Sequence, residues 1–321
     1  MMTLSKIAKL ANVSVSTASK AFSGSAEVNE ETREMIFRVA REHGCFKKFY
    51  NVKFPKLVIA IIAPEFKSSY YTRYLSCLQD ALGAENCELC VSTTGFSPEK
   101  EESLLEYYYK HSNVDGILIL DSHITIEDRY EIPIVSLNSK RKSRCPHEII
   151  NNMYPAMQEC AAYLKEKGVT DVGFVGETLT LGKCRSFAKA LSEVGIELRE
   201  ENIRTTSKRF EEGGYDAMEQ FFQGGHLPRA ILCAYDYMAI GAIRCLTERN
   251  LRVPEDVAVL GMDNLRQGEY LNPPLASISS KTQTLCHLGA KAILGLINGE
   301  SVPEKQEINS TFYLRRSFEI D

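Results

Sequence analysis

"LSKIAKLANVSVSTASKAF", residues 4–22, predicts how the chain begins to fold. Apolar residues recur here at the i, i+3, i+4 and i+7 spacing of one helix face, namely Leu4, Ile7, Ala8 and Ala11. After a break at Asn12, either Ser14 or Ser16 can cap a second helix. The inward face of that helix is predicted at Ala18, Ala21 and Phe22.

The residues that follow predict a third helix. Asn29 is a favourable N-cap, and Glu30 and Glu31 fall in the first turn, where the helix dipole favours carboxylates. The predicted buried face comprises Met35, Ile36, Val39 and Ala40. Three short helices with a tight turn between the first two form a helix-turn-helix.

The outward face of the second helix is short and polar, with Val15, Ser16, Ser19 and Lys20. Short side chains let a helix enter a major groove closely, where serine can bond phosphates or base edges. Lysine can reach a phosphate or guanine, and valine can touch a thymine methyl. The face therefore favours binding to double-stranded DNA, although a solvated face on a small helical bundle has the same spacing.

The charge distribution separates the beginning of the chain from the rest. Residues 1–56 hold ten Lys and Arg against five Asp and Glu, whereas the remaining residues hold 28 against 37. A basic head on an acidic body suggests that the head meets a polyanion. No apolar run approaches the roughly 20 residues of a membrane span, and the first residues do not resemble a secretory signal, so we expect a cytoplasmic, nucleoid-associated protein.

Ten scattered cysteines are expected to be reduced thiols rather than disulfides. Cys87 and Cys90 form a C-x-x-C, but no second pair lies at metal-binding spacing. We therefore expect neither a metal nor a cofactor.

The run "LSKIAKLANVSVSTASKAFSGSAEVNEETREMI" resembles the DNA-binding head of the lactose repressor (LacI/GalR) family, and the resemblance continues through the chain. It implies that Val15 and Ser16 read bases. Lys20 matches a family arginine that also reaches the groove. The resemblance further implies phosphate-positioning roles for Thr3, Ser14, Thr17, Ser19 and Asn29.

The match weakens in "CFKKFYNVKFPK", residues 45–56, which is shorter than the family segment and lacks its hinge-helix pattern. Phe54 could act as a wedge in the minor groove. The alternative is a basic linker that contacts phosphates through Lys47, Lys48 and Lys53. We expect a helix-turn-helix domain over 1–46 and a linker over 47–56.

From residue 57 onward, apolar runs such as "LVIAIIAP", "DGILILD" and "RAILCAYD" alternate with amphipathic segments. This pattern predicts an α/β fold with parallel sheets covered by helices. Phrases such as "RVPEDVAVLGMDN" resemble the family core, which is two-lobed and similar to periplasmic sugar-binding proteins. We expect subdomains at about 57–152 plus 282–311 and about 153–281 plus 312–321.

Ligands of open α/β sheets bind beyond the carboxyl ends of the strands. The resemblance implies an effector cleft between the two lobes, formed by Tyr70, Tyr71, Asn138, Lys183, Tyr235 and Asp263. Lys183 replaces a family arginine and loses its bidentate fork, and Tyr235 replaces an asparagine. Both departures alter the expected specificity, so carbohydrate is only the family default.

These observations predict a DNA-binding regulator, by resemblance a repressor, that acts as a homodimer under the control of a small-molecule effector. The alternative is a regulator whose cleft no longer binds a ligand and which a partner protein controls. We find no P-loop, G-x-S-x-G or H-E-x-x-H motif, so the sequence does not indicate an enzyme. A free-standing sugar-binding protein would need an export signal and no basic head.

Overall fold

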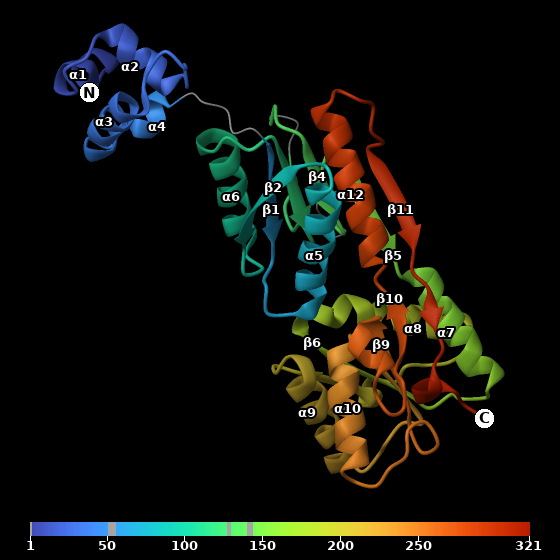
Figure 1. The fold of residues 1–321 in the computed structure, drawn as a ribbon. Helices are drawn as coiled ribbons and strands as arrows, with labels where there is room; N and C mark the ends of the chain where they lie inside the picture. Colours follow the sequence, from blue (N-terminus) through green and yellow to red (C-terminus); the bar gives the residue numbers. More distant parts are fainter. Residues whose placement is uncertain (1, 51–55, 127–129, 140–143) are drawn as a thin grey trace. The chain divides into compact units, whose positions relative to one another are not determined.

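The computed structural model describes residues 2–50, 56–126, 130–139 and 144–321 (Figure 1). The chain divides between Leu57 and Val58 into two units, which we call the head and the core. The linker predictions for Lys53 and Phe54 fall outside the described residues, as does the side chain of Lys47.

The described head consists of α1 (Leu4–Leu10), α2 (Val15–Phe22), α3 (Glu30–Glu42) and α4 (Phe46–Phe49). The first three helices begin at polar caps whose side-chain oxygens accept a backbone N–H three residues on, namely Thr3, Ser14 and Asn29. Such caps satisfy N–H groups that a helix leaves without intrahelical partners. Asn12, at φ 53°, adopts the left-handed conformation in the turn between α1 and α2. Asparagine tolerates that conformation better than most residues.

The head has its own hydrophobic core, which includes Ile7, Ala18, Ile36 and Ala40. On α3 the predicted inward face is partly wrong, because Met35 is exposed and Phe37 is buried instead. The short helix α4, which the sequence pattern did not predict, brings Phe46 and Phe49 onto Phe22, with ring centroids 6.1 and 5.8 Å away. The aromatic cluster therefore extends the head core into the segment predicted as linker.

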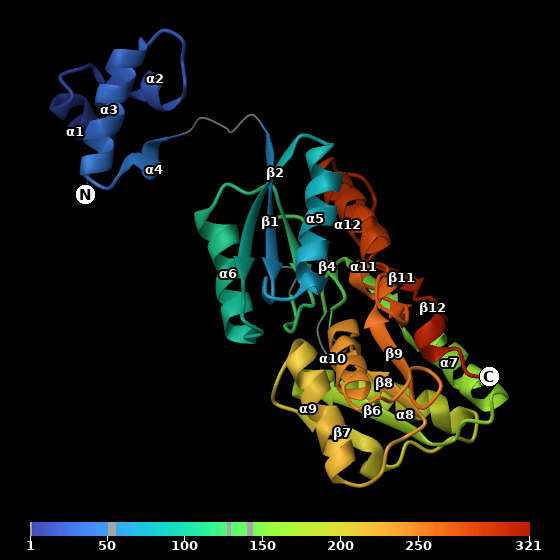
Figure 2. The ribbon, with the colours of Figure 1, turned by 60° about the horizontal axis from the view of Figure 1, so that its bottom comes forward.

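The core contains two sheets, each with six described strands (Figures 1 and 2). Lobe 1 has the order β11-β5-β4-β3-β1-β2, with β1 (Leu57–Ala63), β2 (Cys87–Thr93), β3 (Gly116–Leu120), β4 (Ile134–Leu137), β5 (Glu148–Asn152) and β11 (Lys305–Asn309). Lobe 2 has the order β12-β10-β9-β8-β6-β7, with β6 (Val172–Glu177), β7 (Ile203–Thr206), β8 (Ala230–Cys233), β9 (Ala258–Asp263), β10 (Ala276–Ser279) and β12 (Phe312–Tyr313). β3 pairs in parallel with β1 and β4, and β8 with β6 and β9, whereas β12 runs antiparallel to β10.

Helices cover both faces of each sheet (Figure 2). Lobe 1 carries α5 (Ser69–Gly83), α6 (Pro98–His111) and α12 (Thr282–Ile297). Lobe 2 carries α7 (Tyr154–Glu166), α8 (Leu181–Glu193), α9 (Phe210–Gln223) and α10 (Asp236–Thr247), and the short α11 (Arg266–Glu269) follows β9. α9 and α10 approach closely at Gly214 and Gly241, where an added Cβ would lie 1.9 Å from a backbone oxygen of the facing helix.

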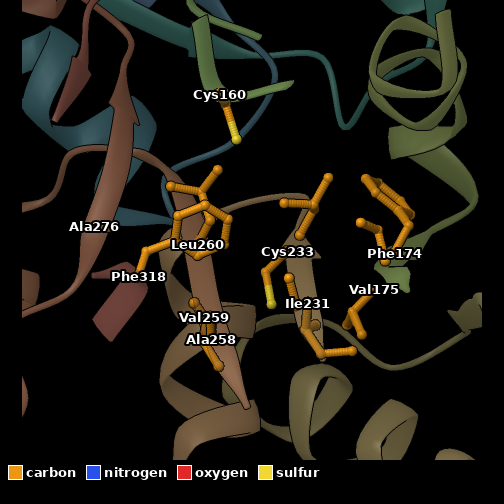
Figure 3. Packing of buried hydrophobic residues seen from close by; sticks show 14 of the residues in the cluster. Cys160, Phe174, Val175, Ile231, Cys233, Ala258, Val259, Leu260, Ala276 and Phe318 are labelled. Atoms are coloured by element: carbon orange, nitrogen blue, oxygen red, sulfur yellow. The ribbon is translucent and has the colours of Figure 1, made fainter. Parts of the chain in front are cut away.

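The core of lobe 2 explains why its strands read as continuous apolar runs. Figure 3 shows Phe174 of β6, Ile231 of β8, Leu260 of β9 and Phe318 in one buried cluster. A parallel strand covered on both faces buries both sets of alternating side chains. The predicted fold class, a helical head joined to a two-lobed α/β core, is confirmed.

The chain passes between the lobes three times along its described path. It crosses after β5 into α7, after β10 into α12, and between β11 and β12. Each lobe is therefore assembled from separate stretches of sequence. The carboxyl ends of β1, β3 and β4 in lobe 1 and of β6, β8 and β9 in lobe 2 supply residues to a shared cleft.

All ten cysteines are free thiols. Cys87 is buried and Cys90 is exposed, at positions three apart on β2. Within the described residues no cluster of His, Cys, Asp or Glu could hold a metal ion, and no helix is long and apolar enough to span a membrane.

Candidate functional site

Helix α2 presents the surface that the sequence assigned to DNA. Val15, Ser16 and Ser19 are exposed, whereas Thr17 and Lys20 are half-buried. Ser14 accepts the backbone N–H of Thr17 at 2.9 Å, and the two hydroxyls lie 2.8 Å apart. The outward face of α2 is therefore small, polar and fixed by its cap.

The predicted phosphate contacts Thr3, Ser14 and Asn29 are the N-caps of α1, α2 and α3. Their side chains lie at the positive ends of helix dipoles, where exposed N–H groups favour an anion. The predicted contacts are therefore helix N-termini and not isolated polar side chains.

A cleft of about 360 Å³ lies between the two lobes of the core. The structure brings all six sequence-predicted cleft residues to its walls, namely Tyr70, Tyr71, Asn138, Lys183, Tyr235 and Asp263. Several strand-end residues turn sharply through positive φ, including Asp121 at 51°, Asn138 at 59° and Asp263 at 98°. Aspartate and asparagine tolerate this conformation, which ends the strands at the cleft.

On lobe 1, the aromatic wall is held by an internal hydrogen-bond network. Tyr71 donates to Asp121 Oδ2 at 2.6 Å, and burial, followed by the Asp121 charge, raises the pKa of Tyr71 far above its usual value. Asn138 Nδ2 donates to Tyr74 at 2.8 Å, and its Oδ1 accepts the Asn151 backbone N–H at 2.9 Å. Asn138 therefore positions the tyrosines, since its amide is largely occupied by protein partners.

On lobe 2, Lys183 and Asp263 form a loosely paired couple. Lys183 Nζ donates to the Ala234 carbonyl at 2.8 Å and lies 3.8 Å from Asp263 Oδ1. Burial raises the pKa of Asp263, while the Lys183 charge lowers it. At this distance the two charges attract each other without a hydrogen bond between them.

Behind this couple lies Asp236, at the first turn of α10 and outside the cleft lining. Its two oxygens accept the Leu265 backbone N–H and the Ser277 hydroxyl, both at 2.6 Å. Burial and the nearby Asp263 charge raise the pKa of Asp236 to about 8. Asp236 therefore ties β9 and β10 to α10 and does not face a ligand.

Arg209, just before α9, connects the lobes across the cleft. Its guanidinium donates to both oxygens of Glu65 in lobe 1, at 2.8 and 2.9 Å, and its Nε lies 3.4 Å from Glu177 of lobe 2. The hydrogen bonds with Glu65 raise the pKa of Arg209. Glu177 also accepts a hydrogen bond from the Tyr235 hydroxyl, which in turn accepts one from the Phe210 backbone N–H. The arginine is thus already neutralised by protein carboxylates.

Three polar atoms of cleft-lining residues are buried without a hydrogen-bond partner in the described structure. They are Asn151 Nδ2, Arg209 Nε and Asp263 Oδ1. Buried polar atoms are usually paired, because leaving one unpaired costs about 1–3 kcal/mol. Two of these atoms are held by ion pairs instead, because Arg209 Nε lies 3.4 Å from Glu177 and Asp263 Oδ1 lies 3.8 Å from Lys183 Nζ.

Known protein families match both the head and the core of this chain. Residues 3–45 match bacterial regulatory proteins of the lacI family, and residues 161–318 match a periplasmic binding protein-like domain. The HTH-type transcriptional repressor PurR of Erwinia tasmaniensis is 28% identical over 334 residues, covering 99% of this chain and 97% of the repressor. PurR of Escherichia coli O139:H28 is 27% identical with the same coverage. The chain belongs to the lacI family.

Solved structures show that this lacI family member has the fold of other regulators. The lac repressor dimer bound to operator and the anti-inducer ONPF aligns with a TM-score of 0.70 and 20% identity, covering 99% of each chain. The transcriptional regulator CelR in complex with cellobiose aligns with a TM-score of 0.69 and 23% identity, covering 99% of this chain and 100% of that one.

This lacI family member is a DNA-binding transcriptional regulator. The prediction that the chain is a regulator and not an enzyme is confirmed, because its matched relatives are transcriptional repressors.

Sequence reasoning missed two polar cleft residues as ligand-site candidates, Asn151 and Arg209. Asp121 and Glu177 stand at the carboxyl ends of β3 and β6, where the strand-end rule already places ligand-binding residues, and both line the cleft. Arg209 precedes a helix and reaches the opposite lobe through its long side chain, for which the sequence gives no signal.

Proposed function

We propose that this regulator is a repressor whose hold on operator DNA is controlled by an uncharged, hydroxyl-rich small molecule bound between the lobes. The observation that carries the proposal is the set of cleft-residue polar atoms that make no hydrogen bond, namely Asn151 Nδ2, Arg209 Nε and Asp263 Oδ1. A hydroxyl both donates and accepts, so one hydroxyl bound beside the Asp263–Lys183 pair would donate to the carboxylate and accept from the ammonium.

The charge of the cleft supports an uncharged ligand. Its lining holds the carboxylates of Asp121, Glu177 and Asp263 against the cations Lys183 and Arg209. Arg209 is engaged by Glu65 and Glu177, so a phosphorylated effector would meet more negative than positive charge.

Aromatic side chains from both lobes support a ligand with an apolar ring face. The lining includes Tyr70, Tyr71, Phe96, Phe210, Tyr235 and Tyr237. Pockets that combine aromatic walls with a few placed polar groups suit small ring compounds. The structurally similar CelR binds cellobiose, and a carbohydrate is accordingly our first candidate class.

For the head, we propose that Val15, Ser16 and Lys20 contact base edges in the major groove. Thr3, Ser14, Thr17, Ser19 and Asn29 would position the head on phosphates. A homodimer formed by the core would place two heads on the half-sites of a pseudo-palindromic operator. Such a regulator would act at the nucleoid in the cytoplasm.

Ligand control would operate through closure of the lobes. Arg209 of lobe 2 contacts Glu65 of lobe 1, and Arg73 of lobe 1 donates to the Asn264 carbonyl of lobe 2 at 3.0 Å. A ligand that bridges the same gap would favour the closed arrangement. It changes DNA affinity only to the extent that it binds the two arrangements unequally.

A thermal-shift screen of neutral sugars, sugar phosphates and nucleosides tests the ligand class. A ligand at 100 times its Kd stabilises the native state by about 2.7 kcal/mol, enough to raise the melting temperature measurably. Asp263→Asn should weaken a neutral ligand by about ten- to hundredfold, because it replaces a charged acceptor by a neutral one. Glu197→Gln, on the exposed surface of lobe 2, is the matched control. A stronger response to sugar phosphates, or equal affinities for both variants, would contradict the proposal, and no response to any compound would favour control by a partner protein.

A further inference from the structure

An ion pair at the end of the proposed recognition helix carries a further inference, which rests on the proposed role of α2. Lys20 on the last turn of α2 is paired with Glu27 in the loop before α3. The Lys20 side chain is 44% exposed and that of Glu27 is 68% exposed. Glu27 is the single acidic residue among the first 29 residues of the sequence, where Lys6 and Lys9 also occur. A carboxylate on a surface that approaches phosphates is costly unless it has a partner there.

The loop that carries Glu27 is anchored to the folded head. The Arg33 guanidinium donates to the carbonyls of Ser25 and Val28, each at 2.9 Å. The Ser25 backbone N–H bonds the Lys20 carbonyl at 3.0 Å, and the Val28 side chain is buried. Glu27 is therefore presented beside Lys20 by a fixed backbone, so the pair does not depend on a mobile loop.

The chemistry of the pair matches one kind of base pair. In the major groove, guanine offers the acceptors O6 and N7, while its cytosine partner offers an N4 amino donor. The Lys20 ammonium has protons to spare beyond its bond to Glu27, and the Glu27 carboxylate has further lone pairs. The two side chains thus place a donor beside an acceptor. A G·C pair places an acceptor, on guanine, beside a donor, on cytosine.

We propose that Lys20 and Glu27 read one G·C base pair together, with Lys20 donating to guanine and Glu27 accepting from the cytosine N4 amino group. Glu27 is then a specificity-determining residue. It also directs the Lys20 ammonium toward base edges and away from the phosphates that would otherwise attract it.

Simple electrostatic repulsion is the competing role for Glu27. A carboxylate that only repels the DNA backbone weakens binding to every sequence by the same factor, because phosphates carry no sequence information. A carboxylate that reads cytosine changes the ratio between sequences. The two roles therefore differ in base preference rather than in overall affinity.

The experiment uses the full-length chain and a pool of duplexes with a randomised centre. Duplexes selected by the wild type define an operator, and Kd is then measured for that duplex and for each single-base-pair replacement. The same set is measured for Glu27→Gln and for Glu31→Gln, which removes an exposed carboxylate from the first turn of α3. We expect the wild type to lose about tenfold or more in affinity when the G·C pair is replaced. We expect Glu27→Gln to lose most of that discrimination and Glu31→Gln to keep it.

Each contrary outcome has a distinct meaning. If Glu27→Gln binds every duplex more tightly by one common factor and keeps the wild-type preferences, the proposal is overturned in favour of repulsion. Lys20→Ala separates this result from a failure of the recognition helix. If Lys20→Ala loses the G·C preference while Glu27→Gln keeps it, only the role of Glu27 is wrong. If Lys20→Ala keeps wild-type affinity and preferences, both the recognition-helix assignment and the present proposal fail. Circular dichroism of the variants confirms that each head is folded.

Discussion

Replacing Phe22 by alanine should strongly destabilise the head and leave the core intact. Phe22 is 2% exposed and lies at the centre of an aromatic cluster with Phe37, Phe46 and Phe49. Phe-to-Ala changes in a packed core cost about 3–5 kcal/mol. At about 0.05–0.15 kcal/mol per residue, a unit the size of the head has a stability of about 3–9 kcal/mol. The substitution therefore removes a large part, or all, of the stability of the head.

Limited trypsin digestion and calorimetry of the full-length chain measure this effect. A loss of about 4 kcal/mol lowers the ratio of folded to unfolded head by about a thousandfold. Phe22→Ala should therefore be cleaved rapidly within its lysine-rich head and lose duplex binding. The calorimetric transition of the core should stay at the wild-type temperature, because the head and the core are separate units.

Leu10→Ala is the matched control in the same head, since Leu10 is 54% exposed and should behave like the wild type. If Phe22→Ala resists trypsin and binds the selected duplex as the wild type does, the aromatic cluster does not determine the stability of the head. If the core transition falls together with that of the head, the two units unfold as one and the prediction is wrong.

Three further predictions concern the core. Gly214→Ala should destabilise lobe 2 by at least about 1–3 kcal/mol, because the added Cβ would overlap a backbone oxygen of α10. Gly182→Ala is the control and should be neutral, since its Cβ meets only a side chain 4.0 Å away. Urea denaturation measures the free energy of unfolding of both variants. Burial raises the pKa of Asp236 to about 8, whereas the pKa of an aspartate in the unfolded chain is about 4. Between about pH 4 and 8, Asp236 is therefore protonated in the native state and ionised in the unfolded state. This group makes wild-type stability fall as pH rises through that window, and Asp236→Asn should show a smaller fall between pH 5 and 8; equal falls would contradict the assignment. A double-mutant cycle of Arg209→Ala and Glu65→Ala should give a coupling of about 0.5–3 kcal/mol in core stability, whereas additive effects would show that the ion pair does not link the lobes.

The sequence predicted the fold class well because its signals are local. Continuous apolar strands, helical spacing and N-caps at Thr3, Ser14 and Asn29 each follow from residues close together in the chain. The failure at Met35 and Phe37 has a simple cause. Met35, Ile36 and Phe37 are consecutive apolar residues, so the spacing alone does not show which of them face the core. The packing of α4 on Phe37 decides this, and α4 was not predicted.

The cleft was less predictable, because it is defined by contacts between distant segments. The family resemblance placed Asn138 in the predicted site, yet its side-chain amide is hydrogen-bonded to Tyr74 and to the Asn151 backbone. Arg209 was missed because its partner Glu65 lies 144 positions away in the other lobe. No spacing rule connects such residues, since their proximity depends on both lobes being folded.

The repeated passage of the chain between the lobes has a consequence for biosynthesis. Lobe 1 needs α12 and β11, and lobe 2 needs β12 and Phe318, so neither can close its hydrophobic core until the ribosome has made these late segments. The head, by contrast, draws its core from residues 2–49 and can form while translation continues. During each round of synthesis, a nascent chain should therefore present a DNA-binding surface before it possesses the cleft that governs it.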